Sequence, residues 1–100
     1  MRGTKTYNQL KRAFLPFAVL KSIQQGHTHG YAILQELEAM EISGIKSGTL
    51  YPLLRTLEED GLVAATWETS DRGPARKIFE LTADGKRNFE EMRNWIDTLT

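Results

Sequence analysis

A chain of 100 residues has room for one hydrophobic core and little else. Its 40% content of hydrophobic residues excludes a disordered chain, and the absence of cysteine excludes disulfides and thiolate metal sites. Its 13 basic and 13 acidic residues give a formal net charge of zero, so no overall charge attracts the protein to nucleic acid.

The charges are nonetheless segregated along the chain. No acidic residue precedes Glu36, and a second basic cluster occupies residues 72–77, whereas the acids gather at residues 36–41, 58–60 and 90–91. The basic residues of the opening segment are Arg2, Lys5, Lys11 and Arg12. Because phosphates respond to the local charge that faces them, this segregation is compatible with one basic face.

No targeting or membrane segment is evident in the sequence. The N-terminus does not resemble a signal peptide. The apolar stretch at residues 14–23 is too short to span a bilayer, and Pro16 and Lys21 interrupt it. We therefore expect a cytoplasmic protein that has no contact with a membrane.

Two helices are predicted in the first half of the chain. The first covers residues 10–25, with Gly26 as its stop and with Pro16 marking either its first turn or a kink. The second covers residues 29–40 and is followed by a turn at residues 43–44. Both rest on apolar residues at helical spacing, which are Phe14, Leu15, Phe17, Leu20 and Ile23, and then Ile33, Leu34, Leu37 and Met40.

A third helix, a hairpin and a last helix follow. The third helix has Ser47 as its N-cap and ends at Gly61, with a stripe of Leu50, Leu53, Leu54 and Leu57. Two runs rich in β-branched and aromatic residues, 62–69 and 77–82, are joined by the turn-forming tract 70–75, which predicts a β-hairpin with a basic tip. The last helix begins at Thr82 and continues to the end of the chain.

The order helix, helix, helix, hairpin, helix is that of a winged helix-turn-helix protein. The predicted class is α+β and mainly α, with three helices, a two-stranded wing and a C-terminal dimerisation helix. We expect residues 1–81 to form a DNA-binding domain and residues 82–100 to form the dimerisation helix.

This arrangement predicts which residues touch double-stranded DNA. The third helix enters the major groove, and basic side chains on the wing bind phosphates. The predicted contacts are Ser47, Gly48, Thr49, Tyr51, Pro52 and Arg55 on the helix, Arg72, Gly73, Arg76 and Lys77 on the wing, and His29 and Tyr31 at the start of the second helix. The alternatives are that Ser47 only caps the helix, that Arg55 is only a solvated surface residue, and that Tyr31 belongs to the core.

Several motifs closely resemble the PadR family of bacterial transcriptional regulators. They are HGYAI at residues 29–33, GTLYPLLR at 48–55, LEEDGL at 57–62, WE at 67–68, GPARK at 73–77, and LT at 81–82 with Gly85. The resemblance covers roughly residues 14–95. The sequence departs from the common pattern at Pro16, and at Ile78 and Glu80, where many relatives have an aromatic and a basic residue.

The resemblance implies a repressor that binds an inverted-repeat operator as a homodimer, with the last helix forming much of the dimer contact. It also places the chain in the short-tailed group, which has a single C-terminal helix. Some members of that group bind flat aromatic or lipophilic compounds at the dimer centre, and this binding reduces their affinity for DNA. Such an effector, an operator and a second copy of the chain are thus the expected partners, and the protein is expected to associate with the bacterial nucleoid when it is bound to DNA.

The last helix independently predicts a homodimer. Phe89, Met92, Ile96 and Leu99 are spaced by three, four and three residues, and such a seam needs a partner face. Trp95 lies beside this seam. It either stacks on a planar effector between subunits or packs against the first helix near Phe14 or Phe17, and we favour the packing.

Other functions are less well supported by the sequence. His27 and His29 with Glu36 are too few ligands to predict a metal site, and no nucleophile–base arrangement, carboxylate pair or phosphate loop is evident. We therefore expect no enzyme, no catalytic residues, no cofactor and no metal. The stronger alternative is a winged helix that binds another protein. The neutral net charge favours this alternative, whereas the basic wing argues against it.

Overall fold

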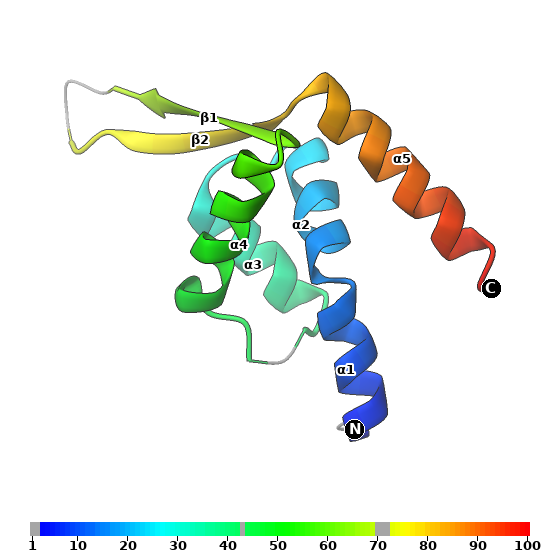
Figure 1. The fold of residues 1–100 in the computed structure, drawn as a ribbon. Coiled ribbons are helices and arrows are strands. Elements are labelled where there is room, and N and C mark those ends of the chain that lie inside the picture. Colours follow the sequence, from blue (N-terminus) through cyan, green and yellow to red (C-terminus); the bar gives the residue numbers. More distant parts are fainter. Residues whose placement is uncertain (1–2, 43, 70–72) are drawn as a thin grey trace.

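The computed structural model describes residues 3–42, 44–69 and 73–100. Its elements in chain order are α1 (Lys5–Ala13), α2 (Leu15–Gln24), α3 (Gly30–Ala39), α4 (Ser47–Glu59), β1 (Val63–Glu68), β2 (Arg76–Leu81) and α5 (Ala83–Asp97). Figure 1 shows that α2, α3 and α4 form the body of the molecule, while the hairpin, α1 and α5 extend from it in different directions. The predicted winged helix-turn-helix fold is confirmed.

The predicted first helix is in fact two helices. Thr4 caps α1 by accepting a hydrogen bond from the Tyr7 amide, and α1 ends at Ala13. Pro16 then lies in the first turn of α2, where its missing N–H has no partner to lose, so its role is that of a helix start. The opening part of α1 was not predicted, because none of its residues is buried and it therefore lacks the apolar stripe of a core helix.

The ends of α4 differ slightly from the prediction. The N-cap is Lys46, which makes no side-chain capping bond, so Ser47 is the first helical residue and the prediction that it is the cap is wrong. The C-terminal prediction is confirmed, since Gly61 follows the helix with φ +76°. Its amide donates to the Glu58 carbonyl at 3.0 Å, and the Leu62 amide donates to the Leu57 carbonyl at 3.0 Å, which is the paired arrangement of a glycine-terminated helix.

The hairpin is anchored to the start of α3. Strands β1 and β2 pair antiparallel, from Val63 opposite Leu81 to Glu68 opposite Arg76. On its other side β2 meets the segment before α3, where the Phe79 amide donates to the Thr28 carbonyl at 2.8 Å and His29 forms a bridge with Ile78. The base of the wing is therefore joined to the helices by main-chain hydrogen bonding.

The core lies between α2, α3 and α4, and it also takes in the base of the wing and part of α5. Its buried apolar residues are Leu15, Ala18, Val19, Leu20, Ile23, Ile33, Leu37, Ile42, Ile45, Leu50, Leu54, Leu57, Val63, Phe79 and Phe89. In the described part of the chain, no helix is both long and apolar enough to cross a bilayer.

The start of α5 is fixed to the end of α4. The Thr82 hydroxyl donates to the Gly61 carbonyl at 2.6 Å and accepts from the Gly85 amide at 2.9 Å. Phe89 then stacks on Phe17 of α2, with ring centroids 4.8 Å apart and planes 8° apart. The first half of α5 thus shares the core with the helices before it, and the division at residues 81 and 82 stays a prediction.

The predicted seam of α5 divides into a buried and an exposed part. Phe89 is only 2% exposed and packs within its own chain, so the prediction that it needs a partner is wrong. Met92 packs partly against the core, and Ile96 is half-buried. Leu99 and Trp95 are each 59% exposed, so the preferred prediction that Trp95 packs against the first helix is also wrong.

Candidate nucleic-acid interface

The predicted contact residues of α4 share its exposed face. Leu50, Leu54 and Leu57 are buried on the opposite side and fix the rotation of the helix. All six predicted contact residues of α4 are exposed, namely Ser47, Gly48, Thr49, Tyr51, Pro52 and Arg55. The first turn of α4 therefore presents small side chains, hydroxyl groups and free backbone N–H groups to solvent, which is the chemistry that favours a phosphate.

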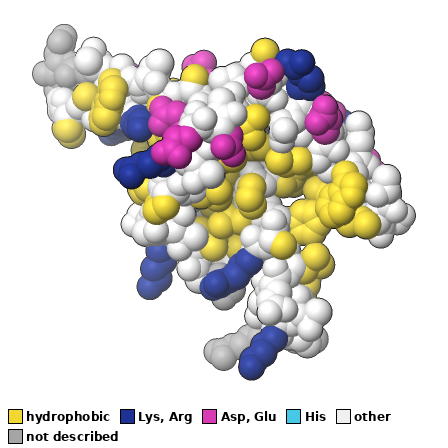
Figure 2. All heavy atoms as spheres, viewed as in Figure 1, with side chains coloured by type: hydrophobic (Ala, Val, Ile, Leu, Met, Phe, Trp, Pro, Cys, Tyr) yellow, Lys and Arg dark blue, Asp and Glu magenta, His cyan; other side chains and the backbone are white. Residues whose placement is uncertain are grey.

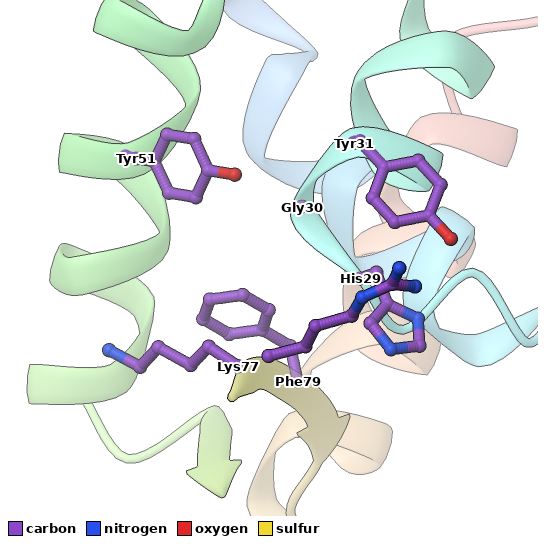
Figure 3. A pocket seen from close by; sticks show the side chains of 7 residues that line it. His29, Gly30, Tyr31, Tyr51, Lys77 and Phe79 are labelled. Atoms are coloured by element: carbon purple, nitrogen blue, oxygen red, sulfur yellow. The ribbon is translucent and has the colours of Figure 1, made fainter. Parts of the chain in front are cut away.

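A cavity of about 280 Å³ lies between the start of α3, the exposed face of α4 and strand β2. Its lining residues are His29, Gly30, Tyr31, Tyr51, Arg76, Lys77 and Phe79 (Figure 3). The structure thus brings together residues of three separate segments that the sequence singled out as DNA contacts. We call this site the α3–α4–wing cavity.

Two of the lining residues were not predicted. Gly30 lies between the predicted contacts His29 and Tyr31. Its importance was missed because it depends on the side chain of Tyr51, which comes from another helix. Phe79 is buried and belongs to the core as well as to the cavity. The run Phe79, Glu80 and Leu81, in which apolar and polar residues alternate, was the sequence signal that could have placed the Phe79 side chain on the inner face of the hairpin.

Aromatic rings and cations alternate in the α3–α4–wing cavity. The ring of Tyr31 lies 5.6 Å from that of His29 and 5.8 Å from the guanidinium carbon of Arg76. The Lys77 ammonium lies 5.5 Å from the ring of Phe79. Because Tyr31 is 55% exposed, the alternative that it belongs to the core is wrong. Because the face of an aromatic ring attracts a cation, the rings of Tyr31 and Phe79 help to orient the side chains of Arg76 and Lys77.

Acidic side chains offset part of this positive charge. Glu58 of α4 lies 3.7 Å from the Lys77 ammonium, and Glu68 of β1 lies 3.7 Å from Nε2 of His29. The His29 Nε2 atom is buried and makes no hydrogen bond to any residue that the structure describes. Both acids are at least partly exposed, so solvent screens these pairs.

Other predicted residues lie away from the cavity or outside the described residues. Ser47, Gly48 and Thr49 are at the far end of α4 from Glu58, and Gly73 lies exposed on the wing beyond β2. The prediction for Arg72 falls outside the described residues. His27 pairs with Glu36 at 3.5 Å whereas His29 faces Glu68, and within the described ranges no three potential metal ligands gather.

These features define a class of protein. A three-helix body carries an exposed helix face and a two-stranded wing whose strand β2 bears Arg76 and Lys77. The base of the wing is hydrogen-bonded to the segment before α3. The chain is a winged helix-turn-helix protein.

The comparison with known proteins narrows this class to one family. The model of the transcriptional regulator PadR-like family matches residues 19–91, and the chain belongs to this family of transcriptional regulators. The predicted resemblance is thereby confirmed.

Individual relatives resemble the chain over most of its length. Transcriptional regulator Rv3488 of Mycobacterium tuberculosis is 31% identical over 91 residues, which are 91% of this chain and 83% of the relative. The crystal structure of a PadR family regulator from Eggerthella lenta is 32% identical, with a TM-score of 0.82, covering 94% of this chain and 81% of that one. Bacillus subtilis PadR, solved in complex with operator DNA, has the same fold at 22% identity, with a TM-score of 0.69, covering 78% of this chain and 45% of that one.

Proposed function

We propose that this protein is a sequence-specific DNA-binding regulator that binds an inverted-repeat operator as a homodimer. The observation that carries the proposal is the α3–α4–wing cavity, where the exposed face of α4 meets the cations of β2 and the aromatic side chains of α3. The operator complex of the Bacillus subtilis relative supports the same use of the fold. The role of repressor rests on membership in the PadR family.

In this proposal the residues divide into those that read bases and those that bind the backbone. The exposed face of α4 lies in the major groove, where Arg55 reaches a base edge. Arg76 and Lys77 lie on the wing and bind phosphates, which position the protein without reading sequence. The neutral net charge is compatible with this division, because phosphates respond to the local charge that faces them, and Arg76 and Lys77 both line the cavity.

The homodimer is supported by apolar surface away from the α3–α4–wing cavity. Trp95 of α5, Leu99 just beyond α5, and Tyr7 and Leu10 of α1 are exposed. A groove of about 400 Å³ lies between α1, α2 and the end of α5. Figure 2 shows hydrophobic side chains gathered on the side of α5 that faces α2. A second copy of the chain would cover this surface and would double the DNA-binding face by twofold symmetry.

An effector at the dimer centre remains part of the proposal. Trp95 is largely exposed, so its ring is accessible to a planar aromatic compound held between two copies of α5. Fluorescence titration of a Trp67→Phe variant tests this idea, because Trp95 is then the remaining indole. If a panel of planar aromatic compounds leaves its emission unchanged, the effector assignment fails.

The proposed function is tested by in vitro selection from a random pool of double-stranded DNA at two salt concentrations. We expect enrichment of an inverted repeat whose half-sites lie about one helical turn apart. We also expect the affinity for non-selected DNA to fall steeply with salt, because several phosphates are contacted. Failure to enrich any sequence would instead favour the protein-binding alternative. We propose no catalytic role, since the family consists of transcriptional regulators.

Replacing Arg55 with alanine should relax the sequence preference. A bidentate contact to a base contributes about 1–3 kcal/mol of discrimination. The difference in binding free energy between the operator and mismatched DNA should therefore shrink by that amount, and the ratio of the two affinities should fall accordingly. Competition binding against single-base variants of the selected operator measures this ratio. Arg93→Ala on α5 is the matched control, because Arg93 is also exposed and, among the described residues, forms an ion pair with Glu90 alone. An unchanged ratio in the Arg55 variant would show that this side chain reads no base.

Replacing both Arg76 and Lys77 with alanine should weaken binding to all sequences equally. Each lost phosphate contact reduces the slope of log affinity against log salt by about 0.9, so the pair should lower it by about 2. Titrations at four salt concentrations measure the slope. The double variant Lys86→Ala and Arg87→Ala on α5 removes the same charge from two exposed residues and should leave the slope unchanged. Equal slopes in the two double variants would contradict the assignment of the wing.

A further inference from the structure

Gly30 is a glycine for reasons of space and not of backbone conformation. It is the first residue of α3 and is buried. Its φ is not positive, since the glycines with positive φ in the described residues are Gly26, Gly44 and Gly61. A helical backbone accepts alanine more readily than glycine, so the conformation alone would favour a side chain at this position.

The phenol of Tyr51 occupies the space that this side chain would take. A Cβ atom on Gly30 would lie 2.7 Å from Cζ and 2.9 Å from Cε1 of Tyr51, and it would lie nearer still to the hydroxyl oxygen. Figure 3 shows the Tyr51 side chain reaching from α4 toward Gly30. Non-bonded carbon atoms approach to about 3.5–4.0 Å, so a methyl group at position 30 and the present position of the phenol exclude each other.

No hydrogen bond holds the Tyr51 hydroxyl within the described part of the chain. The side chain is 48% exposed, so it can rotate into solvent if another group occupies its present position. The surface of α3 at Gly30 is therefore what allows the ring to lie in the α3–α4–wing cavity, beside the cations of β2.

We infer that Gly30 is a positioning residue for DNA binding. Because it has no side chain, it leaves room for the phenol of Tyr51 at the α3–α4–wing cavity, where the Tyr51 hydroxyl donates to a backbone phosphate. This inference rests on the proposed function and adds to it a specific link between α3 and α4. Because a phosphate carries no sequence information, the Tyr51 contact raises the affinity for all DNA and does not affect the choice of operator.

The test begins without DNA. The protein is labelled with 3-fluorotyrosine at its three tyrosines, and the fluorine resonance of Tyr51 is identified from a Tyr51→Phe variant. Gly30→Ala should shift the Tyr51 resonance and leave those of Tyr7 and Tyr31 close to their original positions. Gln35→Ala, on the exposed side of the same helix, should leave all three unchanged. An unmoved Tyr51 resonance in folded Gly30→Ala protein overturns the inference.

The second arm is a double-mutant cycle on DNA affinity. Gly30→Ala should reduce affinity for operator and for non-operator DNA by the same factor, about tenfold, which is the loss of one hydrogen bond to a charged group. In a Tyr51→Ala background the ring is absent, and the same glycine substitution should cause no further loss. Thermal unfolding of each variant establishes that the binding measurements concern folded protein.

The two arms separate this inference from the proposed function. If Gly30→Ala reduces affinity equally in the presence and absence of the Tyr51 ring, the glycine acts by another route and the inference is overturned. A selective change in operator preference would also overturn it, because it assigns Tyr51 to a phosphate. If the parent protein selects no DNA sequence, the proposed function fails, and the fluorine spectra still decide whether Gly30 seats Tyr51.

Discussion

Replacing Phe89 with alanine is expected to lower the free energy of unfolding by about 3–5 kcal/mol. Phe89 is 2% exposed and stacks on Phe17, so its removal leaves a cavity where α5 joins the body of the molecule. For a domain of this size that loss is a large part of a total stability of about 5–15 kcal/mol. Urea denaturation followed by circular dichroism measures the change.

The control for this experiment is an aromatic residue of similar size on the surface. Trp67→Ala removes a side chain that is largely exposed on β1, and we expect a change of about 0.5 kcal/mol or less. All variants are compared at one protein concentration, because the stability of a dimer depends on concentration. A loss below about 1 kcal/mol for Phe89→Ala would show that α5 is not held by this stack.

Replacing Leu99 with aspartate is expected to convert the protein to a monomer. Leu99 lies exposed just beyond the end of α5, and a carboxylate there would be buried without a partner if a second copy covered it. Sedimentation velocity should show the monomer at concentrations where the parent protein is a dimer. Operator affinity should fall by about 100-fold or more, because one subunit no longer holds the other near its half-site.

The matched control adds the same charge to the same helix outside the seam. Asn94→Asp places one carboxylate on an exposed position of α5, and it should leave both the dimer and the operator affinity intact. If the Leu99 variant sediments as a dimer, the exposed end of α5 is not the interface. The exposed apolar residues of α1, Tyr7 and Leu10, would then be the surface to test next.

The sequence predicted those elements whose apolar residues are buried with a regular period. The leucines of α4 are an example, because burial on one face of a helix imposes a period of 3.6 residues. Strands β1 and β2 were predicted instead from their β-branched and aromatic residues and from the turn-forming tract between them. The first residues of α1 left no such pattern, since none of them is buried.

The candidate site was predicted by residue type, but its geometry was not. Tyr51, Tyr31 and Arg76 were singled out separately, whereas their meeting at one cavity depends on how the hairpin returns to α3. The exposure of Trp95 was missed because the spacing of α5 residues does not reveal which part of the helix reaches beyond the core. The role of Gly30 was missed because it depends on a side chain from another helix.

The hydrogen bond from the Phe79 amide to the Thr28 carbonyl joins the wing to the segment before α3, so we expect the two to open together. A hairpin attached only by its ends would open by local fraying, and its amide protons would exchange with solvent quickly. The Phe79 amide is instead released only when the start of α3 separates from β2, two segments that lie far apart in the sequence. We therefore expect this proton to exchange slowly and its exchange to report the separation of β2 from the segment before α3.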